Sequence, residues 1–293
     1  MSPEPTMTAP ATIANALTID VEDYFQVQAY AGAIDRADWD KIPRRVEANT
    51  DLILTALARH GTRATFFTLG WVAERHPALI RRITAAGHEL ASHGYGHQLV
   101  TDLTPQQFRD DLTRAKAILE DIGGVAVAGY RAPTFSIGPR NPWAWDVLAE
   151  TGHTYSSSVF PVRHDLYGAP SAPRGPYQPA ACNLVEIPMT TVQLLGRNLP
   201  CAGGGYFRLL PYAAYRFGVR HLHRREGRPA IFYSHPWEFD PAQPSVPAAK
   251  WSSRFRHRVN LARMPARLDD LLADFTWDRM DRVFADVIAR AAA

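Results

Sequence analysis

Short, nearly continuous apolar runs alternate with helical patterns along this chain. Strands that are buried on both faces of a sheet show such runs. Seven runs of this kind predict strands over residues 17–21, 64–69, 89–92, 125–130, 154–159, 184–189 and 230–234. Because strands that alternate with helices form parallel sheets, the pattern indicates an α/β protein, either a closed barrel or a doubly wound open sheet.

Capping residues and glycines mark the ends of the expected helices. Thr104 and Gln107 form a capping-box pattern at the start of a helix that is expected to end at Gly123. One face of this helix is apolar, through Phe108, Leu112, Ala115 and Leu119. Further helices are expected at about 45–59 and 77–86, each with a glycine close behind it.

The C-terminal part of the chain predicts two amphipathic helices that pack on the sheet. Their apolar positions are Leu268, Leu271, Leu272 and Phe275 in the first helix, and Met280, Val283, Phe284, Val287 and Ile288 in the second. Residues 161–179 hold five prolines and predict a long irregular loop. We therefore divide the chain into a disordered tail (1–15), an α/β barrel (16–240) and a C-terminal helical extension (241–293).

Composition and charge argue against nucleic-acid-binding and membrane-spanning proteins. The 293 residues are 46% hydrophobic, which is sufficient for a sizeable core. The formal charge of +3 is too balanced to indicate a nucleic-acid partner. No apolar run approaches the roughly 18 residues of a membrane span, and the N-terminus lacks the basic and apolar regions of a secretory signal. We therefore expect a cytoplasmic protein without a membrane span.

Two clusters near strand ends combine metal-ligand residue types. Asp20, Glu22 and Asp23 close the first strand, and alternation along the strand puts Asp20 and Glu22 on the same side. His93 and His97 follow the third strand and are four residues apart, a spacing that can present two imidazoles to one metal ion. Two histidines and one carboxylate are a common ligand set for a catalytic metal. The alternatives are a polar exit that caps a helix, and two surface histidines.

Two further clusters follow the fourth and seventh strands. Arg131 could orient a catalytic carboxylate through a bidentate contact, although a salt bridge at the rim is the commoner fate of an arginine. His235 precedes a proline, which holds it in extended geometry, and it could serve as a general acid. Trp237 could stack on the face of a sugar.

Taken together, the four clusters resemble the NodB-like polysaccharide deacetylases, carbohydrate esterase family 4. The similar segments are Thr18–Asp23, His93–His97, Arg131–Pro133 and Tyr233–His235, and the resemblance extends from about residue 16 to 275. It is nearest to the branch associated with exosortase and exopolysaccharide gene clusters, through the segments DVEDYF, GYRAP and SHPWEFDP. The resemblance implies a distorted (β/α)7 barrel, in agreement with seven expected strands.

The resemblance also implies roles for individual residues. Asp20 corresponds to the general base, Arg131 to the residue that orients it and His235 to the general acid. His93 and His97 correspond to ligands of a divalent metal, with zinc as the expected ion, and the third ligand is Glu22 or Asp23. Substrate-binding candidates are Tyr95, Tyr130, Pro133 and Trp237, with Phe135 and Trp143 as further aromatic residues.

One position departs from the family pattern. Ser156 stands where relatives carry an aspartate before two serines, and if that aspartate supports the catalytic histidine, Asp240 or Glu238 could replace it. The expected activity is removal of N-acetyl groups from hexosamine units of a polysaccharide or its precursor, in contact with polysaccharide-biosynthesis machinery. The alternatives are a hydrolase of small amides or ureides on the same barrel, and a carbohydrate-binding protein without activity.

Overall fold

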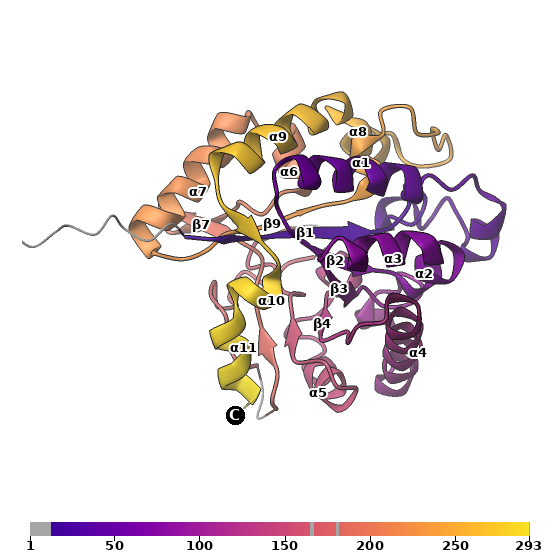
Figure 1. The fold of residues 1–293 in the computed structure, drawn as a ribbon, viewed down its shortest axis with the longest axis horizontal. Coiled ribbons are helices and arrows are strands. Elements are labelled where there is room, and N and C mark those ends of the chain that lie inside the picture. The colour runs from indigo at the N-terminus through magenta and orange to yellow at the C-terminus, as the bar shows by residue number, and fades with distance from the viewer. Residues whose placement is uncertain (1–12, 165–166, 180–181, 293) are drawn as a thin grey trace, which may run out of the picture.

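The computed structural model describes residues 13–164, 167–179 and 182–292. Within them, eight parallel strands form one curved sheet. Seven follow the order β10-β1-β2-β3-β4-β5-β6, and the eighth, β9, also pairs with β1 (Figure 1). The strands are β1 (Asn15–Val21), β2 (Thr65–Thr68), β3 (Glu89–Ser92), β4 (Gly129–Tyr130), β5 (Tyr155–Ser156), β6 (Val185–Glu186), β9 (Ile231–Ser234) and β10 (Trp277–Asp278). Seven of them correspond to the expected strands, which confirms the distorted barrel.

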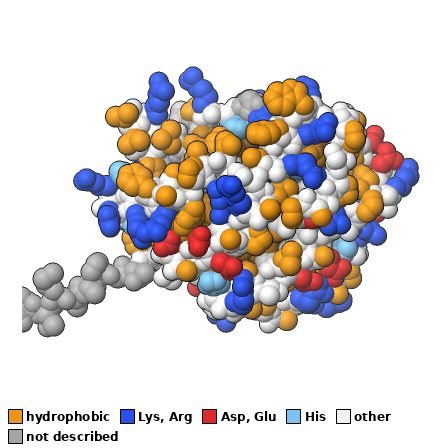
Figure 2. Space-filling view, turned by 90° about the horizontal axis from the view of Figure 1, so that it is seen from above, with side chains coloured by type: hydrophobic (Ala, Val, Ile, Leu, Met, Phe, Trp, Pro, Cys, Tyr) orange, Lys and Arg blue, Asp and Glu red, His pale blue; other side chains and the backbone are white. Residues whose placement is uncertain are grey.

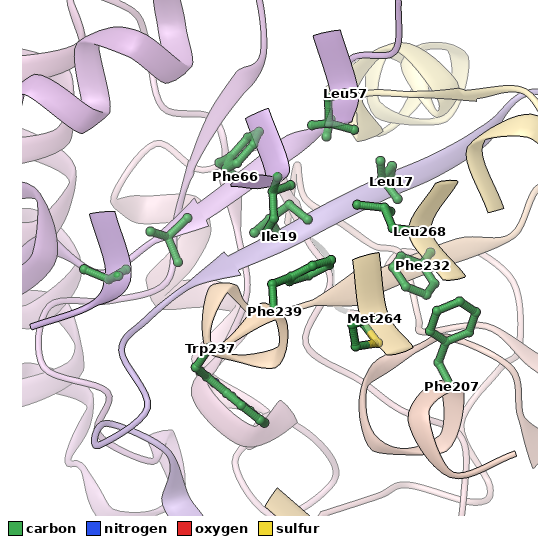
Figure 3. Packing of buried hydrophobic residues seen from close by; sticks show 14 of the residues in the cluster. Leu17, Ile19, Leu57, Phe66, Phe207, Phe232, Trp237, Phe239, Met264 and Leu268 are labelled. Carbon is green, nitrogen blue, oxygen red and sulfur yellow. The ribbon is translucent and has the colours of Figure 1, made fainter. Parts of the chain in front are cut away.

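Strand β1 runs through the centre of the fold because both of its faces are buried. Leu17 and Ile19 face outward and pack beneath α1 (Val46–Arg59) and α9 (Met264–Asp274), through residues such as Leu57 and Leu268 (Figure 3). The alternating Thr18, Asp20 and Glu22 belong to the opposite side, which faces the barrel interior. This alternation delivers the carboxylates to the carboxyl end of the sheet.

Helices cover the outer surface of the sheet. In Figure 1, α1, α7, α8 and α9 lie above β1, whereas α4, α5, α10 and α11 lie below it. The remaining helices are α2 (Gly70–Arg75), α3 (Pro77–Ala85), α4 (Pro105–Gly123), α5 (Trp143–Glu150), α6 (Gly204–Leu209), α7 (Tyr212–Glu226), α8 (Trp251–Arg258), α10 (Met280–Val283) and α11 (Ala285–Ala292). Short 3-10 helices are η1 (Gln28–Tyr30), η2 (Arg36–Lys41), η3 (Val100–Asp102), η4 (Pro133–Phe135), η5 (Pro236–Phe239) and η6 (Leu261–Arg263). Helix α4 begins with the expected capping box at Thr104.

The space between β6 and β9 is filled by a segment that the sequence pattern did not indicate. An antiparallel hairpin, β7 (Thr191–Leu194) and β8 (Arg197–Pro200), leads into Gly203, which forms a parallel bridge with Tyr233 of β9. Gly203 has φ +118°, and a Cβ atom there would lie 2.2 Å from the carbonyl oxygen of Tyr233. Only glycine fits so close to the neighbouring strand.

The C-terminal part differs from the expected pair of helices. Phe275 lies beyond the end of α9 in extended backbone, and the second helix is divided at Phe284 into α10 and α11. Between the two, β10 pairs with the start of β1, which the sequence pattern did not indicate. Residues 1–12 of the expected tail lie outside the described residues, and Asn15 already belongs to β1. No helix in the described part of the chain is long and apolar enough to cross a membrane.

Candidate active site

The carboxyl ends of β1, β3 and β9 and the start of η4 surround a small cavity of about 130 Å³. Sites of α/β barrels form at this end because the loops that leave the strands converge there. The cavity is lined by Asp20, Glu22, Val27, Gln28, His93, His97, Ala132, Thr134, Phe135, Tyr167, Tyr233, His235 and Trp237. It therefore brings together carboxylates, histidines and aromatic rings from segments far apart in the sequence.

Glu22, His93 and His97 form a cluster that could hold a metal ion. One ligand atom from each lies within 4.8 Å of the others, and all three residues are buried. The Glu22 Oε2 atom lies 2.8 Å from Nε2 of His97, yet it accepts no hydrogen bond. A buried carboxylate oxygen without a donor is costly, and a cation between the three side chains would satisfy it. The donor set therefore fits a divalent metal such as zinc.

The loop after β3 holds both histidines in position. His93 donates from Nδ1 to the carbonyl oxygen of Arg131 at 2.7 Å, which directs Nε2 into the cluster. His97 adopts φ +53°, and Arg36 donates to its carbonyl oxygen and to that of Gly96, both at 2.9 Å. The hydrogen bond from Nδ1 to the carbonyl oxygen of Arg131 fixes the tautomer of the His93 imidazole.

Charge states in the cluster suit metal binding. Burial lowers the pKa of His93 to about 4, so its imidazole is neutral at neutral pH. Burial also works to raise the pKa of Glu22, but the neighbouring His97, His235 and His93 lower it to about 2. The cluster thus offers an ionised carboxylate and at least one neutral imidazole.

Of the two carboxylates proposed as third ligand, the structure places Glu22, and not Asp23, beside the histidines. Asp23 accepts hydrogen bonds from the backbone N–H groups of Tyr24, Arg45 and Val46 at 2.7–3.0 Å. Oδ2 is used at the start of α1, where a carboxylate satisfies unpaired amide donors, and Oδ1 accepts from the N–H of the neighbouring Tyr24.

Asp20 forms a buried ion pair with Arg131. The guanidinium Nη1 donates to Oδ1 of Asp20 at 2.7 Å and to Oγ1 of Thr18 at 2.7 Å. Nε and Nη2 donate to the carbonyl oxygen and hydroxyl of Ser157, each at 3.1 Å. Arg131 is fully buried, so these contacts fix the guanidinium and hold the carboxylate of Asp20 toward the cavity.

His235 lies on the opposite side of the cluster and is supported by Glu238. Its Nδ1 lies 2.8 Å from Oε1 of Glu238, whose other oxygen accepts from Nε of Arg208 at 2.6 Å. Burial works to lower the pKa of His235, but the charges of Glu22 and Glu238 raise it to about 9. The imidazole is accordingly protonated at neutral pH and can donate a proton.

Of the two carboxylates considered as supports for His235, Glu238 contacts the imidazole and Asp240 pairs with an arginine elsewhere. Asp240 pairs with Arg45 and lies 3.4 Å from Asn49, so it stabilises α1 and not the histidine. The departure at Ser156 does not reach His235 either. Ser156 is opposite Glu186 in the β5–β6 register, so an aspartate there would place two buried carboxylates side by side.

The substrate-binding candidates divide into two groups. Trp237 lines the cavity, stacks on His235 at a centroid distance of 5.0 Å and donates from Nε1 to Glu22 at 3.2 Å. The side chains of Tyr95, Tyr130 and Pro133 do not line this cavity. Tyr95 donates its hydroxyl to Glu74, and Tyr130 packs against Phe108 in the core.

Two aromatic residues that we did not expect also line the cavity. Tyr233 lies on β9 two residues before His235, so strand alternation could have indicated it. Tyr167 comes from the proline-rich loop and stacks on Phe160 at 5.8 Å. Phe135 lines the cavity, as expected, whereas Trp143 packs against Phe108.

Comparisons with known proteins agree with this geometry. Residues 38–156 match the polysaccharide deacetylase family, and residues 157–285 match a domain of unknown function, DUF3473. A polysaccharide deacetylase structure from Mycobacterium smegmatis, assigned to that class without proof of activity, has a TM-score of 0.61 and 21% identity. That alignment covers 100% of this chain and 96% of the other, and it supports the fold.

Curated relatives match only part of this chain. A peptidoglycan-N-acetylglucosamine deacetylase from Bacillus cereus is 33% identical over 84 residues, 29% of this chain and 30% of the relative. A chitooligosaccharide deacetylase from Bradyrhizobium is 32% identical over 108 residues, 36% of this chain and 47% of the relative. The chain thus spans less than half the length of these relatives. Residues 38–156 thus belong to the polysaccharide deacetylase family, and the chain continues from there into a DUF3473 segment.

Proposed function

We propose that this protein is a metal-dependent hydrolase that removes N-acetyl groups from hexosamine units of a polysaccharide and releases acetate. The observation that carries the proposal is the buried Glu22–His93–His97 cluster, with an ion-paired Asp20 and a His235 held by Glu238 in the same cavity. An acid, a base and a metal-ligand set in one cavity are the groups that amide hydrolysis needs. The names of the relatives support N-acetylated sugar polymers as the substrate class.

Each side chain has a distinct part in the reaction. Glu22, His93 and His97 would hold a divalent metal, for which we propose zinc, and the bound ion would supply Lewis-acid polarisation of the acetyl carbonyl. Asp20 accepts the proton of the attacking water, and Arg131 orients that carboxylate. His235 gives its proton to the leaving nitrogen, which is a poor leaving group as an unprotonated amine.

The aromatic lining supports a sugar substrate. Tyr233, Phe135 and Tyr167 line the cavity with aromatic rings, on which sugar rings can pack their apolar faces, whereas Trp237 is stacked between His235 and His257. We further propose, from the resemblance to the exosortase-associated branch, that the substrate is an exopolysaccharide or its precursor and that the enzyme acts in the cytoplasm with biosynthetic proteins.

The first test is acetate release by the zinc-loaded protein from a panel of N-acetylhexosamine oligomers. We expect release from at least one oligomer, and loss of release in Asp20→Asn and His93→Ala. The matched control is Asp38→Asn, whose carboxylate is half exposed and pairs with Lys41 on the surface. Stoichiometric zinc without release from any oligomer would refute the substrate class. Release that persists in Asp20→Asn would refute the site.

A further inference from the structure

Two stretches of the chain, 187–225 and 241–268, carry six basic residues each and no acidic residue, and the first of them lies next to an exposed apolar surface. The segment from Ile187 to Arg225 contains six arginines and no aspartate or glutamate, so the rest of the chain has a net charge of −3. In the structure this segment forms the β7–β8 hairpin, α6 and α7. The net charge of +3 does not reveal this uneven distribution of charge, and the six arginines lie on neighbouring elements.

The outward face of α7 combines these arginines with an exposed aromatic ring. Helix α7 buries Tyr215, Val219 and Leu222, and its opposite face borders a surface groove lined by Ala213, Arg216, Phe217, Arg220, His221, Arg224 and Arg225. The Phe217 side chain is 64% exposed. In Figure 2, hydrophobic and basic side chains lie beside one another at the left, where α7 lies.

Few acidic groups neutralise this face. Asp274 lies 3.6 Å from Arg216 and 3.8 Å from Arg220, which are long contacts for an ion pair. Among the residues that the structure describes, no carboxylate pairs with Arg224 or Arg225. The positive charge therefore remains available to an anionic partner.

The tip of the β7–β8 hairpin exposes leucine side chains, one of them at a turn position whose conformation favours asparagine. Leu195 and Gly196 form the two-residue turn with φ of +50° and +74°, a conformation that favours Asn-Gly. The Leu195 side chain is 94% exposed, and Leu194 and Leu199 beside it are 47% and 44% exposed. Neither the turn conformation nor the core accounts for a leucine at this position.

The hairpin and the helix are in contact. Gly218 of α7 faces Val192 of β7, since a Cβ atom on Gly218 would lie 3.5 Å from that side chain. We name the outward face of α7 together with the hairpin tip the α7 surface. It is defined by Leu195, Arg216, Phe217, Arg220, Arg224 and Arg225.

We propose that the α7 surface docks on an anionic lipid bilayer. The arginines would contact lipid phosphates, and Leu195 and Phe217 would enter the boundary between headgroups and acyl chains. Exposed aliphatic side chains favour a bilayer over a nucleic acid, whose contacts with proteins are mostly polar. None of these residues lines the catalytic cavity, so docking would leave that cavity free for substrate.

Vesicle co-sedimentation of the full chain tests the proposal. We expect binding to vesicles in which about one third of the lipid is phosphatidylglycerol, and little binding to pure phosphatidylcholine, because each basic residue contributes about fivefold in affinity at an anionic surface. Arg220→Glu/Arg224→Glu should weaken binding at least about tenfold on the same basis. The control, Arg81→Glu/Arg140→Glu, changes the charge equally at exposed arginines on other elements and should bind like the wild type.

A second variant separates docking from folding. Leu195→Asn suits the turn better than leucine does, so it should keep or raise the thermal midpoint while it weakens vesicle binding. Its control is Leu52→Ser on α1, where the leucine is 55% exposed. Absence of vesicle binding, equal binding to both vesicle types or wild-type binding by the arginine variant would overturn the proposal. Heparin binding that depends on the arginines, with no effect of Leu195→Asn on vesicles, would indicate a general polyanion surface and would also overturn it.

Discussion

The ion pair between Glu238 and Arg208 carries a quantitative prediction. Both side chains are at most 3% exposed, and Arg208 also donates to the carbonyl oxygens of His257 and Val259 at 2.9 and 3.0 Å. Replacing Glu238 with glutamine removes one charge and leaves the guanidinium buried without its counter-charge. We expect Glu238→Gln to lose about 3–5 kcal/mol of unfolding free energy, the usual cost of breaking a buried pair.

Urea unfolding measures this loss, with Asp269→Asn as the control. Asp269 pairs with Arg59 at 2.7 Å at the surface, so its replacement should cost below about 1 kcal/mol. The double variant Arg208→Met/Glu238→Gln removes both charges and should recover most of the lost stability. It should not recover kcat, because His235 still lacks the carboxylate that holds its imidazole.

Three results would refute this reasoning. A loss below about 1 kcal/mol for Glu238→Gln would mean that the pair is solvated as a surface pair is. Additive losses in the double variant would mean that the two charges do not depend on each other. Full kcat in Glu238→Gln would show that His235 needs no such support.

Two further predictions follow from carboxylates with distinct surroundings. Glu22→Ala should abolish stoichiometric zinc binding, whereas Asp23→Ala should retain the zinc and lose about 1–2 kcal/mol of stability, because Asp23 caps α1. Elemental analysis measures the bound zinc, and urea unfolding measures the stability. Loss of zinc in Asp23→Ala would contradict the assignment. Burial and the nearby charge of Asp281 raise the pKa of Glu89 from 4.5 to about 7. Between these values the unfolded chain releases its proton while the folded protein keeps it, so stability falls as pH rises through this window. Glu89→Gln should reduce that slope and gain up to about 3 kcal/mol at pH 8, and an unchanged slope in its pH-dependent unfolding would contradict this origin.

The sequence predicted best those parts of the fold that local patterns determine. The expected strand at 89–92 coincides with β3, and the capping box at Thr104 begins α4 as expected. The run at 125–130 contributes only Gly129 and Tyr130 to the sheet, and Val125 is 42% exposed. An apolar run therefore indicates that a strand exists more reliably than where it begins, since pairing partners decide its length.

In the candidate site too, the sequence predicted the residues that have a local signal and missed those that depend on the path of the chain. Alternation along β1 and the spacing of His93 and His97 were local signals, and the structure brings Asp20, Glu22 and both histidines to one cavity. Tyr130 was a substrate-binding candidate as the residue next to Arg131. Adjacent residues of a strand face opposite sides, so the Arg131 side chain enters the barrel and the Tyr130 side chain packs in the outer core. Tyr167 reaches the cavity through the path of a long loop, which no local pattern specifies.

The position of β10 has a consequence for the order of folding. Strand β1 pairs with β2 along Thr18–Val21, but its other edge pairs with β9 and its start pairs with Trp277–Asp278 of β10, both more than 200 positions later in the sequence. Contacts between such distant segments close large loops and form late. During synthesis, the strand that carries Asp20 would therefore meet β2 early and would lack β9 and β10 until nearly the entire chain is made. The sheet built by residues 15–156 is therefore completed only by the DUF3473 segment, which supplies both β9 and β10.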